Sequence, residues 1–168
     1  IASVQQLFWR ACETMLMDHT NPWELDEALV AWGYGLGPCE AQDLVGLDVI
    51  MRNWCGDQPS PILARMVAEG RLGKKVSWGF YRYPGGGGTV IDPLIEDLIL
   101  EEAWFAKRPR VPLEGAALVT RLHELVADVL YVLPLVELGP PSAVLKRVEL
   151  RPVNAEELAK GRVFPALI

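Results

Sequence analysis

The sequence predicts an all-α protein. Apolar residues recur at intervals of three and four along several segments, which is the period of a helix with one buried face. Pro and Gly residues separate these segments, and little of the chain alternates between apolar and polar residues as a half-buried strand does. Hydrophobic residues make up 51% of the 168 residues, which is enough for a buried core.

Five helices are expected in the first part of the chain. Apolar residues at helical spacing indicate the first, over residues 2–17. Asn21 followed by Pro22 is typical of an N-cap with proline at the first helical position, and Gly33 ends that second helix. Gly and Pro residues also bound the remaining three helices, which we expect at residues 38–45, 47–55 and 61–69.

Two segments without helical periodicity follow. Residues 73–83 combine aromatic and small residues, and we expect an extended loop there. Four consecutive glycines at residues 85–88 carry too much backbone freedom for a regular element, so we expect a hinge within residues 85–92.

Helices are again expected beyond the glycines. Asp92 before Pro93 caps a helix that reaches about Ala106, and residues 114–133 form a longer one. Residues 144–150 fit a helix or a strand, and Asn154 caps a short helix that ends at Gly161.

Charge and composition exclude several classes of function. The net charge of −6 is spread along the chain, so neither a nucleic acid nor an anionic membrane is an expected partner. No run of eighteen apolar residues is present to span a bilayer. Cys12, Cys39 and Cys55 lack paired spacing, which favours reduced thiols in a cytoplasmic protein and gives no metal site.

No self-sufficient catalytic group emerges from the residues, and no catalytic residue is predicted in this chain. The glycines at 33, 35 and 37 follow a helix and are wrongly spaced for a dinucleotide loop, so they indicate a turn. His19 lies at a helix end beside Asp18, where a structural role is expected. We expect His123 on the solvated edge of its helix.

Several other residues that attract attention have ordinary interpretations. The acidic pairs Glu101-Glu102 and Glu156-Glu157 are typical of solvated helix faces. Four of the six tryptophans fall on expected helices, which indicates a core or interface role for Trp9, Trp23, Trp32 and Trp54.

An ordered series of short motifs nevertheless runs from about Trp23 to Tyr83. It comprises Leu25-Asp26-Glu27-Ala28, Gly33-Tyr34-Gly35-Leu36-Gly37-Pro38, Asp43-Leu44-Val45-Gly46-Leu47-Asp48, Pro59-Ser60-Pro61, Met66-Val67, Gly70-Arg71-Leu72-Gly73-Lys74-Lys75 and Gly79-Phe80-Tyr81-Arg82-Tyr83. In order and spacing the series resembles the C-terminal domain of 3-hydroxyacyl-CoA dehydrogenases.

The resemblance implies a helical bundle like the C-terminal domain of 6-phosphogluconate dehydrogenase. It implies an N-terminal Rossmann domain in the same polypeptide, with NAD and an acyl-CoA substrate bound between the two domains. The implied reaction is oxidation of 3-hydroxyacyl-CoA to 3-ketoacyl-CoA in fatty-acid β-oxidation, by a protein that forms a homo-oligomer such as a dimer. The catalytic residues of the family lie upstream of Ile1, so we expect a fragment that is inactive alone.

Lys75 is the one functional residue that the resemblance transfers to this chain. It occupies the place of the family lysine that reaches the bound nicotinamide cofactor, and a cation there suits an anionic dinucleotide. The alternative is a solvated lysine beside Lys74. Two positions depart from the family pattern: Cys39 replaces an aromatic residue and Ser77 replaces a glycine. These departures favour altered substrate shape or a degenerate relative.

The expected organisation is therefore a family domain at residues 1–84, a hinge at 85–92 and a second helical unit at 93–168. The second unit is either a degenerate second copy of the domain or a family-specific extension. A non-catalytic helical module for dimerisation or interaction is the rival interpretation of the whole chain.

Overall fold

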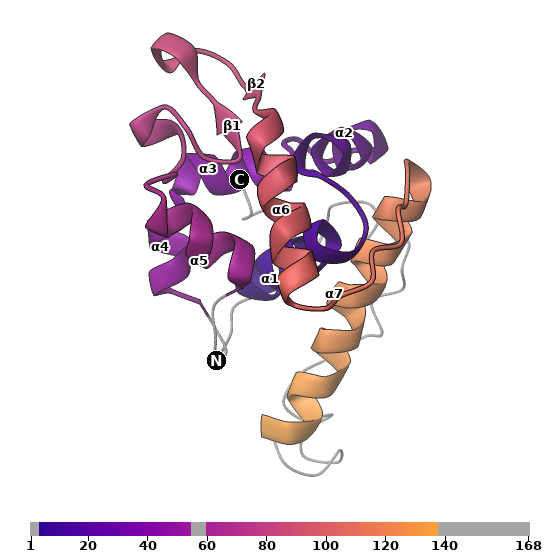
Figure 1. The fold of residues 1–168 in the computed structure, drawn as a ribbon. Helices are drawn as coiled ribbons and strands as arrows, with labels where there is room; N and C mark the ends of the chain where they lie inside the picture. Colours follow the sequence, from indigo (N-terminus) through magenta and orange to yellow (C-terminus); the bar gives the residue numbers. More distant parts are fainter. Residues whose placement is uncertain (1–3, 55–59, 138–168) are drawn as a thin grey trace.

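The computed structural model describes residues 4–54 and 60–137 and confirms the all-α class (Figure 1). In chain order the elements are α1 (Val4–Asp18), α2 (Pro22–Trp32), α3 (Pro38–Val45), α4 (Leu47–Arg52), α5 (Pro61–Ala68), the 3-10 helix η1 (Lys74–Val76), β1 (Tyr81–Arg82), the 3-10 helix η2 (Pro84–Gly86), β2 (Val90–Ile91), α6 (Pro93–Phe105) and α7 (Ala116–Glu137). The predictions at 144–150 and 154–161 lie outside the described residues.

Helix α1 is the centre of the bundle. It contacts α2, α3, α5, α6 and α7, and its apolar residues are buried on more than one side. The sequence predicted one buried face, but Trp9, Cys12 and Glu13 are buried as well. A helix enclosed by neighbours buries most of its circumference, and this burial supplies much of the stabilising energy of the core.

Local chemistry sets the helix boundaries as expected. The Asn21 side chain accepts a hydrogen bond from the Glu24 N–H at 3.0 Å, and Asp92 accepts one from Leu94 N–H at 3.2 Å. Gly33 ends α2 with a φ of 129°, which is readily available only to glycine. Helix α4 is shorter than predicted, because it ends at Arg52, where the Asn53 N–H donates to the Val49 carbonyl and the Trp54 N–H donates to the Met51 carbonyl.

The prediction for residues 73–88 was wrong in two details. Residues 74–76 form the 3-10 helix η1, and β1 pairs with β2 in an antiparallel ladder across the four glycines, with η2 at its turn. Strand pairing uses backbone groups alone, so it needs no alternating side chains. Gly85 and Gly86, at φ of 62° and 75°, supply the left-handed backbone of the turn.

Helices α6 and α7 share one hydrophobic cluster with α1–α5, to which Ile95, Leu98, Leu118, Leu122 and Val126 all belong. The division of the chain at residues 84 and 93 is tested by no observation and stays a prediction.

The segment between α6 and α7 is bonded to the C-terminal end of α1. Arg110 donates to the Leu16 and Thr20 carbonyls at 2.6 and 2.9 Å. The His19 ring bonds the Val111 carbonyl at 2.8 Å, which fits the structural role expected of that histidine. The Arg110 bonds satisfy carbonyls that the end of α1 leaves unpaired.

His123 was predicted on the solvated edge of its helix, and this prediction was wrong. Its side chain is only 8% exposed, and its Nε2 lies 3.0 Å from the Tyr34 hydroxyl. It contacts the Trp32 ring edge-on at a centroid distance of 4.9 Å. Helix α7 packs against both α1 and α2, so its buried face is wider than its apolar residues indicate.

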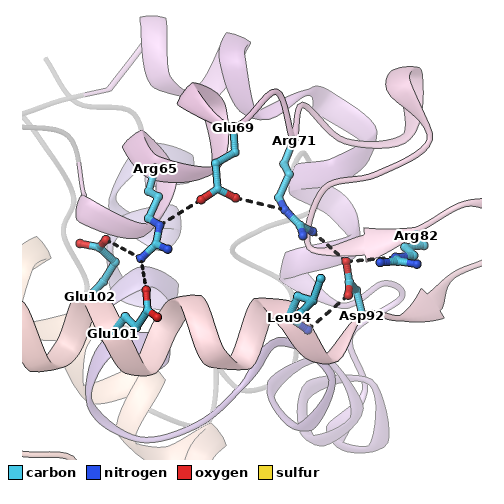
Figure 2. Close-up of polar contacts among 8 residues, drawn as sticks. All are labelled: Arg65, Glu69, Arg71, Arg82, Asp92, Leu94, Glu101 and Glu102. Atoms are coloured by element: carbon cyan, nitrogen blue, oxygen red, sulfur yellow. Dashed lines mark hydrogen bonds and ion pairs between the residues drawn. The ribbon is translucent and has the colours of Figure 1, made fainter.

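An ion-pair network joins α5, the β1–β2 strands and α6 (Figure 2). Arg71, just after α5, binds Asp92 at the start of α6, and Arg82 of β1 reaches the same carboxylate at 3.1 Å. Arg65 on α5 pairs with Glu101 and Glu102 on α6 at 2.8 and 3.1 Å. The Glu101-Glu102 pair is therefore engaged with α5 as well as facing solvent.

Candidate functional site

The loop that carries Lys75, residues 73–83, is closed on itself by backbone hydrogen bonds. Gly73 N–H donates to the Trp78 carbonyl at 2.9 Å, and Tyr83 N–H donates to the Ser77 carbonyl at 2.9 Å. Ser77 has a φ of 67°, in the left-handed region that favours glycine. The family pattern has glycine there, so this position explains why the pattern prefers glycine and shows that serine is tolerated.

Asp43 on α3 holds this loop against the helices. One carboxylate oxygen accepts from Phe80 N–H and the other from Tyr81 N–H and the Tyr83 hydroxyl, all at 2.9 Å. The carboxylate is 1% exposed. Burial raises its pKa to about 6, and the hydrogen bonds limit that rise. A carboxylate thus organises a loop whose sequence shows no periodicity.

Asp26 on α2 is a second buried carboxylate that holds the loop, through Tyr81, and also the start of α3. It accepts from the Cys39 and Glu40 N–H groups at 2.8 and 2.9 Å, at the start of α3, and from the Tyr81 hydroxyl at 2.9 Å. Burial raises the pKa of Asp26 to about 6, and these donors lower it in part. Because Tyr81 contacts Asp26 with its hydroxyl and Asp43 with its N–H, it links α2, α3 and the loop.

Glycines pack directly onto these two carboxylates. A Cβ at Gly37 would lie 2.2 Å from the Asp26 Cγ, and one at Gly79 would lie 2.0 Å from an Asp43 oxygen. At Gly73 it would meet the Asp43 carbonyl oxygen at 2.2 Å. The sequence predicted a turn before α3 in place of a dinucleotide loop, and the structure adds that Gly37 in this turn is needed for close packing against Asp26.

Lys75 lies on the outer side of the loop, in η1, with 45% of its side chain exposed. Its ammonium group forms an ion pair with Asp48 at the start of α4. The hydrogen bond from Lys75 is the main cause that lowers the pKa of Asp48. Lys74 differs, since its ammonium lies 5.6 Å from the centre of the Tyr83 ring. The two adjacent lysines thus face different surroundings, and only Lys75 borders α4.

Apolar side chains are exposed around this lysine. Val76 and Trp78 lie on the loop, and Leu44 and Val45 lie at the end of α3. The Arg71 guanidinium stacks over the Trp78 ring, 4.4 Å from its centre. A groove of about 200 Å³ opens on α1, α3 and α4, lined by Gln5, Gln6, Trp9, Val45, Val49, Ile50, Asn53 and Trp54. Its apolar walls and amide groups suit an amphipathic ligand or another protein surface.

Cys39 and Cys12 are free thiols in the core. Both are fully buried, and burial holds the pKa of each thiol well above its ordinary value. The thiols are therefore protonated and unreactive at neutral pH. Cys39 stands in place of a family aromatic, so this departure changes core packing beside Asp26. Cys55 lies outside the described residues.

Sequence reasoning missed Asp26, Asp43 and Asp48 as organisers of the loop, although all three lie within the quoted motifs. The available signal was an acidic residue held among Gly and apolar residues. It also missed Glu13, whose carboxylate accepts from Leu63 N–H at 3.2 Å in the first turn of α5. Burial raises the pKa of Glu13 to about 8.

In residues 4–54 and 60–137 no three His, Cys, Asp or Glu side chains are grouped closely enough to hold a metal ion. None of the helices there has the length and apolar character that a bilayer requires.

Comparisons with known proteins agree on a family. Residues 3–83 match the family model described as the C-terminal domain of 3-hydroxyacyl-CoA dehydrogenase. A mitochondrial hydroxyacyl-coenzyme A dehydrogenase of Homo sapiens is 41% identical over 71 residues, which are 36% of this chain and 23% of the relative. A peroxisomal bifunctional enzyme of Danio rerio is 29% identical over 106 residues, which cover 51% of this chain and 15% of that protein.

A solved structure shares the fold. The dehydrogenase part of a multifunctional enzyme from Caenorhabditis elegans superposes with a TM-score of 0.62 at 19% identity, over 82% of this chain and 32% of the other. The chain spans about a quarter or less of the curated relatives it matches. Residues 3–83, a little under half of this chain, are thus similar to the C-terminal domain of 3-hydroxyacyl-CoA dehydrogenase.

Proposed function

We propose that this chain is the helical part of an NAD-dependent 3-hydroxyacyl-CoA dehydrogenase that oxidises 3-hydroxyacyl-CoA to 3-ketoacyl-CoA in β-oxidation. The family match over residues 3–83 supports this proposal most directly. NAD and the acyl-CoA substrate then bind between this domain and an N-terminal Rossmann domain of the same polypeptide. The chain alone is inactive, the enzyme forms homo-oligomers, and its expected location is the cytoplasm, although the relatives are named as mitochondrial or peroxisomal.

Lys75 is the residue of this chain that contacts the cofactor. An ammonium group has three N–H donors, and Asp48 engages one face of it, which leaves donors directed to solvent. The loop beneath it is rigid, because Asp43 fixes three of its polar groups. A cation held on a rigid loop is suited to an anionic dinucleotide, because little side-chain order is lost on binding.

NAD bound beside Lys75 would supply the hydride chemistry of the reaction. The residues of this chain bind and orient. Lys75 supplies positive charge, and the exposed apolar residues around it pack against part of the N-terminal Rossmann domain. Leu44, Val45 and Trp78 provide that contact in this proposal.

A non-catalytic interaction module is the second candidate. The observations that favour it are Cys39 and Ser77, which occupy positions where the family pattern has an aromatic residue and a glycine. Both residues are accommodated here without loss of the loop, since Ser77 still accepts the Tyr83 hydrogen bond.

Acetoacetyl-CoA-dependent oxidation of NADH distinguishes the two candidates. The assay compares the chain alone, the nucleotide-binding domain alone, and the two together in one polypeptide. Activity only in the joined protein supports the dehydrogenase. A joined protein that is folded, binds NADH and shows no turnover identifies the non-catalytic module.

A further inference from the structure

The Lys75 ammonium lies over the junction between α3 and α4. Gly46 forms this junction with a φ of 101°, in the left-handed region that favours glycine. A Cβ at Gly46 would lie 3.1 Å from the Lys75 Nζ and 3.5 Å from its Cε. The end of the lysine side chain is therefore close to the backbone of the junction, where glycine leaves room for it.

Asp48 meets the ammonium at the same place. Its Oδ1, in the first turn of α4, accepts a hydrogen bond from the Lys75 Nζ. A Gly46 Cβ would also lie 3.1 Å from that oxygen, so backbone, carboxylate and ammonium come together at one point. The chain just before the Lys75 loop is bonded there as well, because the Leu47 N–H donates to the Leu72 carbonyl at 3.1 Å. Both the backbone and the ammonium of the lysine are thus held against one junction.

The ion pair leaves positive charge available for an anionic ligand. The second oxygen of Asp48, Oδ2, lies 3.9 Å from an Arg52 Nη, one turn further along α4. One carboxylate between two cations leaves this group with an excess of one positive charge. The side chains of Arg52 and Lys75 are 73% and 45% exposed, against 30% for Asp48. The group therefore presents positive charge to solvent, and repulsion of an anion by Asp48 is offset.

A lysine benefits from such a partner because its side chain is flexible. Its ammonium ends a four-carbon stem that loses rotamer freedom whenever a ligand fixes it. Contact with Asp48 restricts the stem in advance, so less freedom is lost on binding. An exposed ion pair contributes little to the stability of a fold. We therefore expect the effect of Asp48 on ligand affinity to exceed its effect on folding.

We propose that Asp48 is the positioning residue for Lys75, because its carboxylate and the Gly46 backbone hold the ammonium in the orientation that contacts the dinucleotide. The inference rests on the proposed function, since Asp48 acts through the contact of Lys75 with the cofactor. Asp48 itself contacts neither cofactor nor substrate in this proposal.

NADH titration of the joined two-domain protein tests this role in a double-mutant cycle. Asp48→Asn removes the charge and keeps the size of the side chain and an oxygen acceptor in the first turn of α4. We expect this variant to bind NADH about three- to tenfold more weakly, the effect of immobilising one flexible side chain on binding. In the Lys75→Ala background the same substitution should change the affinity by less than about twofold, because no lysine remains to be positioned.

Acetoacetyl-CoA-dependent oxidation of NADH supplies a second readout. Asp48→Asn should raise the KM for NADH by about the factor seen in Kd and change kcat by less than about twofold, because the lysine binds and does not react. Asp48→Glu retains the charge and should recover part of the affinity. Asp18→Asn is the matched control: it removes a comparable exposed ion pair, with Arg108, and should leave Kd and KM unchanged. Circular dichroism verifies that each variant is folded.

The cycle separates the ways in which the inference can fail. Unchanged or tighter NADH binding by Asp48→Asn, together with weaker binding by Lys75→Ala, identifies Asp48 as an exposed counter-ion and leaves the proposed function standing. A loss by the same factor in both backgrounds shows that Asp48 acts other than through Lys75, which also overturns the positioning role. Unchanged binding by Lys75→Ala removes the cofactor contact itself, and the proposed role of Lys75 fails together with that of Asp48.

Discussion

Arg71 and Asp92 form an ion pair in the interior, where an Arg71 Nη lies 2.8 Å from an Asp92 oxygen and the side chains are 4% and 1% exposed. Burial acts to raise the pKa of Asp92, but hydrogen bonds from Arg71 and Arg82 outweigh it and hold the pKa below its ordinary value. The pair joins the end of the matched domain to the first turn of α6 (Figure 2).

Arg71→Ala is expected to destabilise the fold strongly. It removes the buried partner of Asp92 and leaves that carboxylate with only the half-exposed Arg82 as counter-charge. Removal of one partner of a buried pair commonly costs about 3–5 kcal/mol. Urea unfolding followed by circular dichroism measures the loss. Arg82→Ala is the control, because Arg82 touches the same carboxylate from an exposed position and its removal should cost about 1 kcal/mol or less. Equal losses in the two variants would contradict this account.

Stability is expected to fall as the pH rises from about 6 to about 8. Glu13 has a folded pKa of about 8 against an ordinary value of 4.5, so the folded state holds this proton where the unfolded state has lost it. The stabilising contribution of Glu13 is fully present below its pKa in the unfolded chain and is lost as the pH rises through its pKa in the folded protein. Asp26 and Asp43, with pKa values of about 6, contribute in the same direction at lower pH.

Glu13→Gln tests the origin of that slope, because glutamine resembles the protonated acid and does not titrate. The free energy of unfolding of this variant should change much less between pH 6 and pH 8 than that of the unchanged chain. An undiminished slope in the variant would assign the pH dependence to other groups.

Gly79→Ala is expected to disrupt the Lys75 loop. The new methyl group would lie 2.0 Å from an Asp43 oxygen, and relief of that clash displaces the carboxylate from its three donors. Overpacking of this kind costs about 1–3 kcal/mol. Gly88→Ala has no atom within 4 Å of the new methyl and should change stability by less than about 0.5 kcal/mol. Chemical denaturation of the two variants side by side provides the measurement.

Tyr34→Phe is expected to loosen the contact of α7 with α2. It removes the hydroxyl that lies 3.0 Å from the His123 Nε2 and leaves a buried polar atom without that partner, at a cost of about 1–3 kcal/mol. Hydrogen exchange of the α7 amides should accelerate more than that of the α5 amides. Uniform acceleration across both helices would show that α7 does not respond separately.

Features set by neighbouring residues could be predicted from the sequence, and features set by distant ones could not. The Asn21 and Asp92 caps depend on groups two or three residues away, and both were predicted correctly. The loop at residues 73–83 is shaped by Asp43, which is 37 residues away from Phe80. No local pattern encodes that pairing, so the loop was predicted only as extended.

The buried position of His123 had the same cause. Burial of a polar side chain depends on whether a distant group can bond it, and the Tyr34 hydroxyl is 89 residues away in the chain. Lys75, by contrast, was proposed as a cofactor contact from the ordered motifs, while its ion pair with Asp48 follows only from the packing of η1 against α3 and α4.

NADH titration of the joined two-domain protein tests the central claim most directly, with Lys75→Ala and Lys74→Ala compared as neighbours of equal charge. Lys75→Ala should weaken NADH binding several-fold while urea unfolding stays within about 0.5 kcal/mol, because its ion pair with Asp48 is exposed. Lys74→Ala should leave the affinity nearly unchanged. Equal NADH affinity in the Lys75→Ala variant and the unchanged protein would contradict the assignment of Lys75 to the cofactor.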